Sequence, residues 1–308
     1  MTSATTAELQ SVLQTWSAPI GVNLALFLAV AIYARGWFRL HAASPDLISI
    51  SRMVAFLAGI GSVWIAVGSP LNAFDDVSLT VHMIQHLLLM AIAPPLILLG
   101  APALALLQGL PRPLAAKVVG PFLRWRFVKE LGRVVSNPAI CWLAAAIALI
   151  VWHVPAVFEL ALRWDWLHEI EHTSFLAAGL LFWWPVVQPW PSASRWPRWS
   201  IPLYLFFATL PCDALSGFLV FCDRVVYSSY LSAPKVFTLS ALRDQELAAA
   251  LMWTCVTFIF LIPAAVIAIS ILSPQRTRQA DDTYAKTNLA RDQIHSVAGK
   301  EASTVYVR

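Results

Sequence analysis

Long apolar runs separated by short polar segments make up most of the chain. Seven such runs can be placed, at residues 17–35, 52–72, 80–107, 138–158, 168–190, 200–221 and 245–272. Their lengths suit helices that cross a bilayer, which need about 20 apolar residues. The alternating segments of about ten residues that build a transmembrane barrel are not visible. The pattern therefore predicts an all-α, polytopic membrane helix bundle with seven transmembrane helices.

Prolines and a polar tail modify this picture. The third run is long and contains Pro94-Pro95, which we expect to bend or break the helix. The first run lacks the basic segment and cleavage site of a signal peptide, so we expect it to be retained. We predict a single bundle domain over residues 1–272 and a polar, disordered cytoplasmic tail over residues 273–308.

Composition and charge supply the orientation. Hydrophobic residues make up 59% of the chain and charged residues 12%, with a mean hydropathy of +0.69, whereas soluble domains carry about 25% charged residues. With the N-terminus outside and the C-terminus in the cytoplasm, 17 of the 21 Lys and Arg residues fall in inner segments, as the positive-inside rule requires. The net charge of +4 is then a topology signal, and we expect contact with membrane lipid and none with nucleic acid.

Histidines gather at the outer ends of three predicted helices. Residues four apart lie on one helical face, about 6 Å apart at Cβ, so an H-x-x-x-H pair directs two imidazoles into one space. A single interfacial histidine is commonly just a hydrated hydrogen-bonding residue, but imidazole is also a ligand for copper, zinc and iron. Five on one side favour a shared metal site. His82 and His86 open the third run, His153 closes the fourth, His168 and His172 open the fifth, and only His41 and His295 lie elsewhere.

The string HEIEH, residues 168–172, also fits the zinc-protease pattern H-E-x-x-H. Those proteases need a soluble cleft and a third ligand downstream, and the sequence offers neither. Glu169 is better explained as an acceptor for the N–H of a ligand imidazole, or as an interfacial charge. The other acidic residues on this side, Glu171 among them, are expected to be mainly solvated loop charges.

Two further acidic positions fall at or inside the runs. Asp244-Gln245 begins the seventh run, where Asp244 can cap the helix, orient a metal ligand, or do both. Asp213 lies about 12 Å inside the sixth run by helical rise. A carboxylate at that depth indicates either a functional role or a hydrogen bond to a neighbouring Ser, Thr or Trp.

Soft side chains are also present. Met83, Met90 and Met252 offer thioether ligands for Cu(I), although methionine in a bundle more often fills gaps. The four cysteines are widely spaced and contain no C-x-x-C motif, so we expect buried, inert thiols.

Four strings occur in this order along the chain: MIQHLLLMAIAPPLILLGAP, WHVPAVFELAL, LHEIEHTSFLAAGLLFWWP and LSALRDQELAAALMW. Through these strings the chain resembles the CtaG family of multi-span cytochrome c oxidase assembly factors, over about residues 50–272. The resemblance implies a multi-pass protein of the bacterial inner membrane that helps to make the haem–copper oxidase, with copper handling as the suggested role. The family's motif residues correspond to His86, His153, His168, His172 and Asp244-Gln245, while His82 and Asp213 lie outside the motif.

The leading hypothesis is therefore a non-enzymatic assembly factor that binds or delivers copper, as Cu(I), through an outward-facing histidine cluster, with zinc as the alternative ion. We expect its partners to be the haem–copper subunit I of the oxidase and periplasmic copper chaperones. The predicted ligands are His86, His153, His168 and His172; the residues expected to support the site or admit the metal are His82, Glu169, Asp213, Asp244 and Gln245.

Three other classes stay open. An intramembrane zinc hydrolase would use three histidines with Asp213 or Asp244 as base. A b-type haem protein would use two histidines on different helices as axial ligands. A transporter is less favoured, because the chain has no internal repeats.

Overall fold

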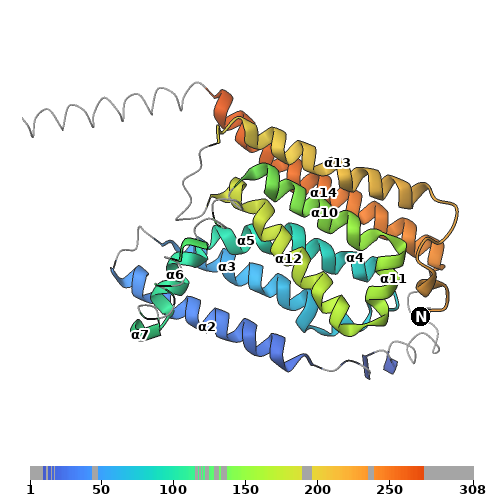
Figure 1. The fold of residues 1–308 in the computed structure, drawn as a ribbon, viewed down its shortest axis with the longest axis horizontal. Coiled ribbons are helices and arrows are strands. Elements are labelled where there is room, and N and C mark those ends of the chain that lie inside the picture. Colours follow the sequence, from blue (N-terminus) through green and yellow to red (C-terminus); the bar gives the residue numbers. More distant parts are fainter. Residues whose placement is uncertain are drawn as a thin grey trace, which may run out of the picture.

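Figure 1 shows a computed structural model of the chain. It describes residues 18–43, 48–114, 137–188, 196–234 and 239–273, together with some positions between 10 and 16 and between 117 and 132. The predicted tail beyond residue 273, with His295, lies outside the described residues.

All regular structure in the described residues is helical, as predicted. The longer helices are α2 (Ile20–Ala43), α3 (Ile50–Val63), α4 (Leu79–Leu87), α5 (Ala93–Leu99), α6 (Pro102–Gly109), α10 (Pro138–His153), α11 (Pro155–Arg163), α12 (Asp165–Val187), α13 (Ser200–Phe221) and α14 (Ala241–Leu272). The shorter ones are the π-helical turns η1 (Trp64–Gly68) and η3 (Leu88–Ile92), the 3-10 turns η2 (Pro70–Ala73) and η5 (Ser228–Leu231), and α7 (Arg112–Leu114).

Several helices are suited to a membrane. Five helical segments of the described chain are long and apolar enough to cross a bilayer, and a sixth is added if α10 and α11 form one bent span. Helix α12 has 23 residues and thus the length of a span, but its first half carries the polar residues of HEIEH. Large apolar side chains such as Phe27, Phe218 and Ile269 are exposed, as expected for surfaces that face lipid. The prediction of a polytopic helical membrane protein is confirmed in this form.

The third apolar run ends earlier than the sequence pattern predicts. The helix from Leu79 is continuous to Leu99, so Pro94-Pro95 does not break it. The π-helical turn η3 ends at Ile92, two residues before Pro94, and local π-helical turns let a membrane helix accommodate the N–H groups that prolines lack. The third run then ends at Ala101, which has a left-handed φ of 49° before Pro102 begins α6.

The fourth apolar run also ends earlier than predicted, at a sharp turn after His153. Val154 takes an extended conformation with ψ 123°, because a residue before proline is disfavoured in the helical region. Pro155 then starts α11, which is bent by 75° from α10. The turn leaves His153 at the end of α10 and lays α11 across that end of the bundle (Figure 1).

Helices α4 and α5 run through the middle of the bundle. Helix α4 packs on α14, and α5 packs on both α3 and α12. Helices α13 and α14 form one side of the molecule, while α2 lies on the other and packs on α6 (Figure 1). The histidines of α4 are therefore enclosed by helices on several sides.

Candidate metal centre

The start of α4 is fixed by an acidic side chain from another helix. The residue before α4, Ser78, does not cap it with its own side chain. Instead the Asp244 carboxylate of α14 accepts hydrogen bonds from Leu79 N at 2.7 Å and Thr80 N at 3.3 Å. It also accepts from the hydroxyls of Ser78 at 3.0 Å and Thr80 at 2.6 Å. Because a carboxylate at a helix N-terminus is stabilising, Asp244 sets the position of the helix that carries His82 and His86.

Two glutamines bind backbone groups that the helices leave free. Gln85 of α4 donates to Ala66 O at 2.8 Å, in the π-helical turn η1, and to Asn72 Oδ1 at 3.2 Å. Gln245 of α14 accepts from Val226 N at 2.7 Å and donates to two carbonyl oxygens around the end of α13. These bonds tie α4 to η1 and the end of α13 to α14.

Two pairs of histidines face each other between α4 and α12. The ring centroids of His82 and His86 are 4.4 Å apart, and those of His168 and His172 are 4.2 Å apart. Between the helices, the His82 ring lies 5.2 Å from that of His168, and the His86 ring lies 5.9 Å from that of His172. Four imidazoles thus share one buried space.

Glu171 lies within this group and is completely buried. Its Oε1 is 3.4 Å from His86 Nε2 and 3.8 Å from His82 Nε2. Ligand atoms of His82, His168 and Glu171 all lie within 4.8 Å of one another. Ligands of a tetrahedral ion at about 2.0–2.2 Å are about 3.3–3.6 Å apart. These three residues, called the His–Glu triad below, could close on one metal ion with small side-chain movements.

Many polar atoms of the cluster have no hydrogen-bond partner. Among the described residues this holds for both ring nitrogens of His82 and His86, for Nε2 of His168 and His172, and for both carboxylate oxygens of Glu171. Buried polar atoms are nearly always paired, and each unpaired one costs about 1–3 kcal/mol. A bound ion would satisfy several of them together. Imidazole and carboxylate donors fit copper or zinc.

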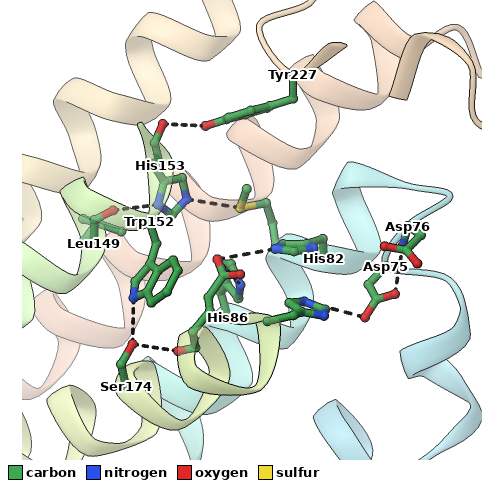
Figure 2. Close-up of polar contacts among 12 residues, drawn as sticks. Asp75, Asp76, His82, His86, Leu149, Trp152, His153, Ser174 and Tyr227 are labelled. Atoms are coloured by element: carbon green, nitrogen blue, oxygen red, sulfur yellow. Dashed lines mark hydrogen bonds and ion pairs between the residues drawn. The ribbon is translucent and has the colours of Figure 1, made fainter. Parts of the chain in front are cut away.

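His153 lies beside the cluster and contacts a methionine. Its Nδ1 is 2.7 Å from Leu149 O, and its Nε2 is 3.4 Å from Met83 Sδ. Its ring centroid is 5.9 Å from that of His86. Figure 2 shows the ring held between Leu149 and the thioether, with the Tyr227 hydroxyl donating to the His153 carbonyl oxygen at 3.1 Å.

The segment between α13 and α14 covers the cluster together with α11. The Phe158 ring lies 4.9 Å from the His82 ring on one side and 4.1 Å from the Tyr227 ring on the other. Glu159, the next residue of α11, accepts a hydrogen bond from Ser229 N at 3.0 Å. These contacts shield His82 from water on the side of α11.

The edge of the cluster is acidic. His168 is the one triad residue with measurable exposure, 16% of its side chain, and its Nε2 lies 3.9 Å from Asp75 Oδ2. Burial, and then the neighbouring Asp76 carboxylate, raise the pKa of Asp75 to about 8. The Tyr230 hydroxyl donates to Asp75 O at 2.8 Å and fixes this segment. With this pKa the Asp75 carboxyl group is mostly protonated at neutral pH, so a cation that binds it beside His168 would displace its proton.

The predicted support residues have different positions. Asp244 caps α4 rather than its own helix, which Ser240 caps by accepting from Arg243 N. Glu169 is exposed on α12. Asp213 is half-buried on α13, and its buried Oδ1 has no partner among the described residues.

Glu171 is the functional candidate that sequence reasoning missed. It is not a solvated loop charge, because α12 starts at Asp165 and turns Glu171 inward. Its position three residues after His168 and next to His172 is the signal that could have found it, since residues at i, i+3 and i+4 share a helical face. In a zinc protease the glutamate would stand at position 169, which is exposed here.

Comparison with known proteins assigns the family. Residues 31–273 match the family described as cytochrome c oxidase caa3 assembly factor (Caa3_CtaG). The chain belongs to this family. The resemblance noted in the sequence is confirmed.

Curated relatives of this caa3 assembly factor family member are longer proteins. An uncharacterized protein of Mycobacterium bovis is 26% identical over 256 residues, which cover 80% of this chain and 38% of the relative. An uncharacterized protein of Mycobacterium leprae is 23% identical over 271 residues, which cover 83% of this chain and 40% of the relative. The chain thus spans about two fifths of the length of these relatives. No solved structure matches it.

Proposed function

We propose that this protein binds copper at the buried histidine–glutamate cluster and supplies it to a cytochrome c oxidase during assembly. In this proposal the chain is not an enzyme. It crosses the bacterial inner membrane seven times with its N-terminus outside, so that the cluster faces the periplasm. Its partners are the haem–copper subunit I of the oxidase and periplasmic copper chaperones. Family membership and the distribution of Lys and Arg support this assignment.

One observation carries the proposal. Around Glu171, several buried imidazole nitrogens and both carboxylate oxygens, all of them possible metal ligands, have no hydrogen-bond partner among the described residues. A purely structural cluster would pair its imidazoles with protein hydroxyls or carbonyls, because lone buried donors and acceptors are costly, and the described residues do not supply these partners. Copper and zinc both bind imidazole. The proposal names copper because the family serves an oxidase that contains it. His86, His168 and His172 from the predicted ligand set line this space, and His82 and Glu171 join them.

The test is complementation of a strain that lacks this chain. Wild-type protein should restore oxidase activity, while His86→Ala and His172→Ala should accumulate in the membrane without restoring it. His41→Ala is the matched control, because His41 lies in the last turn of α2, outside the histidine cluster, and its Nδ1 contacts Ile48 O. Full oxidase activity with either cluster variant would refute the proposal.

A zinc-dependent hydrolase is the second candidate. Two histidines and one carboxylate, as in the His–Glu triad, are a ligand set that catalytic zinc also uses. Metal analysis separates the two functions: stoichiometric zinc in protein purified without added metal, with normal oxidase in the deletion strain, would favour the hydrolase.

A b-type haem fits the site less well. The cavity beside His86 and His153 has a volume of about 50 Å³, so the surrounding side chains would have to move apart to hold a porphyrin. An absorption spectrum of the purified protein without a Soret band would agree with this conclusion.

A further inference from the structure

We propose that Met83 and His153, together with His86, form a second metal site beside the His–Glu triad, selective for the soft monovalent ion Cu(I). Silver(I) serves as a redox-inert probe of the same chemistry. The inference rests on the proposed function for the identity of the natural ion, and on the geometry around Met83 for the site itself.

Hydrogen bonding fixes which nitrogen of His153 is free. A carbonyl oxygen can only accept, so His153 Nδ1 must donate its proton to Leu149 O at 2.7 Å. In the neutral imidazole, Nε2 then carries a lone pair, and it points at Met83 Sδ from 3.4 Å. The thioether sulfur has no proton to offer. Two lone-pair donors therefore face each other, which is the arrangement that a cation between them would stabilise.

The spacing of these two atoms fits one ion. Typical metal–nitrogen and metal–sulfur distances are about 2.0 and 2.3 Å. With these values, a nitrogen–sulfur separation of 3.4 Å corresponds to a ligand–metal–ligand angle of about 105°. This angle suits a three- or four-coordinate ion and leaves room for another ligand. His86, whose ring centroid is 5.9 Å from that of His153, is within reach to supply it.

The surroundings select for softness and low charge. Met83, His86 and His153 border a cavity of about 50 Å³ whose other walls include Met90, Met252 and Cys212. The described residues that line it include no carboxylate. Thioether and imidazole donors in an apolar space favour Cu(I) over hard divalent ions, because a higher charge would be buried without an anion.

The His–Glu triad has the opposite character. It supplies a fully buried carboxylate and two imidazoles, which also suit divalent ions. His86 lies between the two sites, since its Nε2 is 3.4 Å from Glu171 Oε1 while its ring also lines the cavity. The two sites should therefore respond to different substitutions.

The experiment titrates the purified full chain in detergent with Cu(I) or Ag(I), and separately with Co(II) as a divalent probe. Met83→Leu should weaken Cu(I) and Ag(I) binding by about 10-fold or more, and should remove the sulfur scatterer from the X-ray absorption spectrum of the Cu(I) form. Co(II) binding should be unchanged. Met252→Leu is the matched control, because Met252 lines the same cavity and the substitution nearly conserves volume. Glu171→Gln should give the reverse pattern, with Co(II) lost and Cu(I) retained.

Two outcomes would overturn the inference. One is a Met83→Leu protein that keeps its Cu(I) affinity and its sulfur scatterer. The other is a Glu171→Gln protein that loses Cu(I) and Co(II) together, which would mean a single site. Oxidase assembly is measured separately, so normal oxidase in the deletion strain would refute the proposed function and leave the Met83–His153 site intact.

Discussion

The capping of α4 by Asp244 gives a quantitative prediction. Asp244→Ala removes the acceptor of four hydrogen bonds, two of them from the backbone N–H groups of Leu79 and Thr80. The two hydroxyls can turn to other acceptors, but the two N–H groups cannot. An unpaired N–H costs about 1–3 kcal/mol in a buried place such as that of Leu79. The part-buried N–H of Thr80 adds a smaller cost, so the expected loss of stability is about 2–4 kcal/mol.

The assay is thermal unfolding of the detergent-solubilised protein. At about 2–4 °C per kcal/mol for a domain of this size, the midpoint should fall by at least about 4 °C. Asp244→Asn keeps one oxygen acceptor, so its unfolding midpoint should fall by less.

The matched control lies on the same turn of α14. Glu246→Gln breaks the ion pair between Arg243 Nη1 and Glu246 Oε2, which are 2.7 Å apart on an exposed surface. Exposed pairs contribute about 0–1 kcal/mol, so this midpoint should hardly move. Equal midpoints for Asp244→Ala and Glu246→Gln would refute the assignment of Asp244 as the cap of α4.

Two further stability predictions test the packing around the site. Gly179→Ala should sharply reduce the yield of folded protein, because the added Cβ would lie 2.6 Å from Met90 O, where α12 meets η3. Gly217→Ala is the control, because its added Cβ would have its nearest neighbour 3.9 Å away. Equal yields of the two variants in size-exclusion chromatography would contradict the predicted close approach. Tyr230→Phe should cost about 1–2 kcal/mol, because it leaves Asp75 O without the hydroxyl that donates to it at 2.8 Å. An unchanged unfolding midpoint would show that this bond does not stabilise the segment.

Local patterns in the sequence were sufficient to predict the helices and the inward-facing histidine pairs. Helical spacing alone places His82 and His86 on one face of their helix, and His168 and His172 on one face of theirs. The turn after His153 has a local cause in Pro155, although the fourth apolar run was predicted to continue to residue 158. These features depend on a few adjacent residues, so they can be read before any helix is packed.

The residues that the sequence could not place depend on contacts between distant segments. Asp244 caps a helix that begins 165 positions earlier in the chain, and no local signal distinguishes this from a cap on its own helix. The pairing of Met83 with His153 likewise depends on the relative rotation of α4 and α10. Glu171 is intermediate: its helical phase was readable, but its complete burial follows from packing against α4.

The most direct test of the central claim is the copper-to-haem ratio of the oxidase isolated from cells that carry a variant of this chain. Glu171→Gln and Glu169→Gln make the same chemical change on the same helix, one in the buried cluster and one on the exposed face. We predict copper-deficient oxidase with Glu171→Gln, because this variant keeps Cu(I) only at the Met83–His153 site and loses the metal of the histidine–glutamate cluster that is proposed to supply the oxidase. We predict a normal ratio with Glu169→Gln, at equal amounts of each variant in the membrane. A normal copper-to-haem ratio with Glu171→Gln would contradict the account.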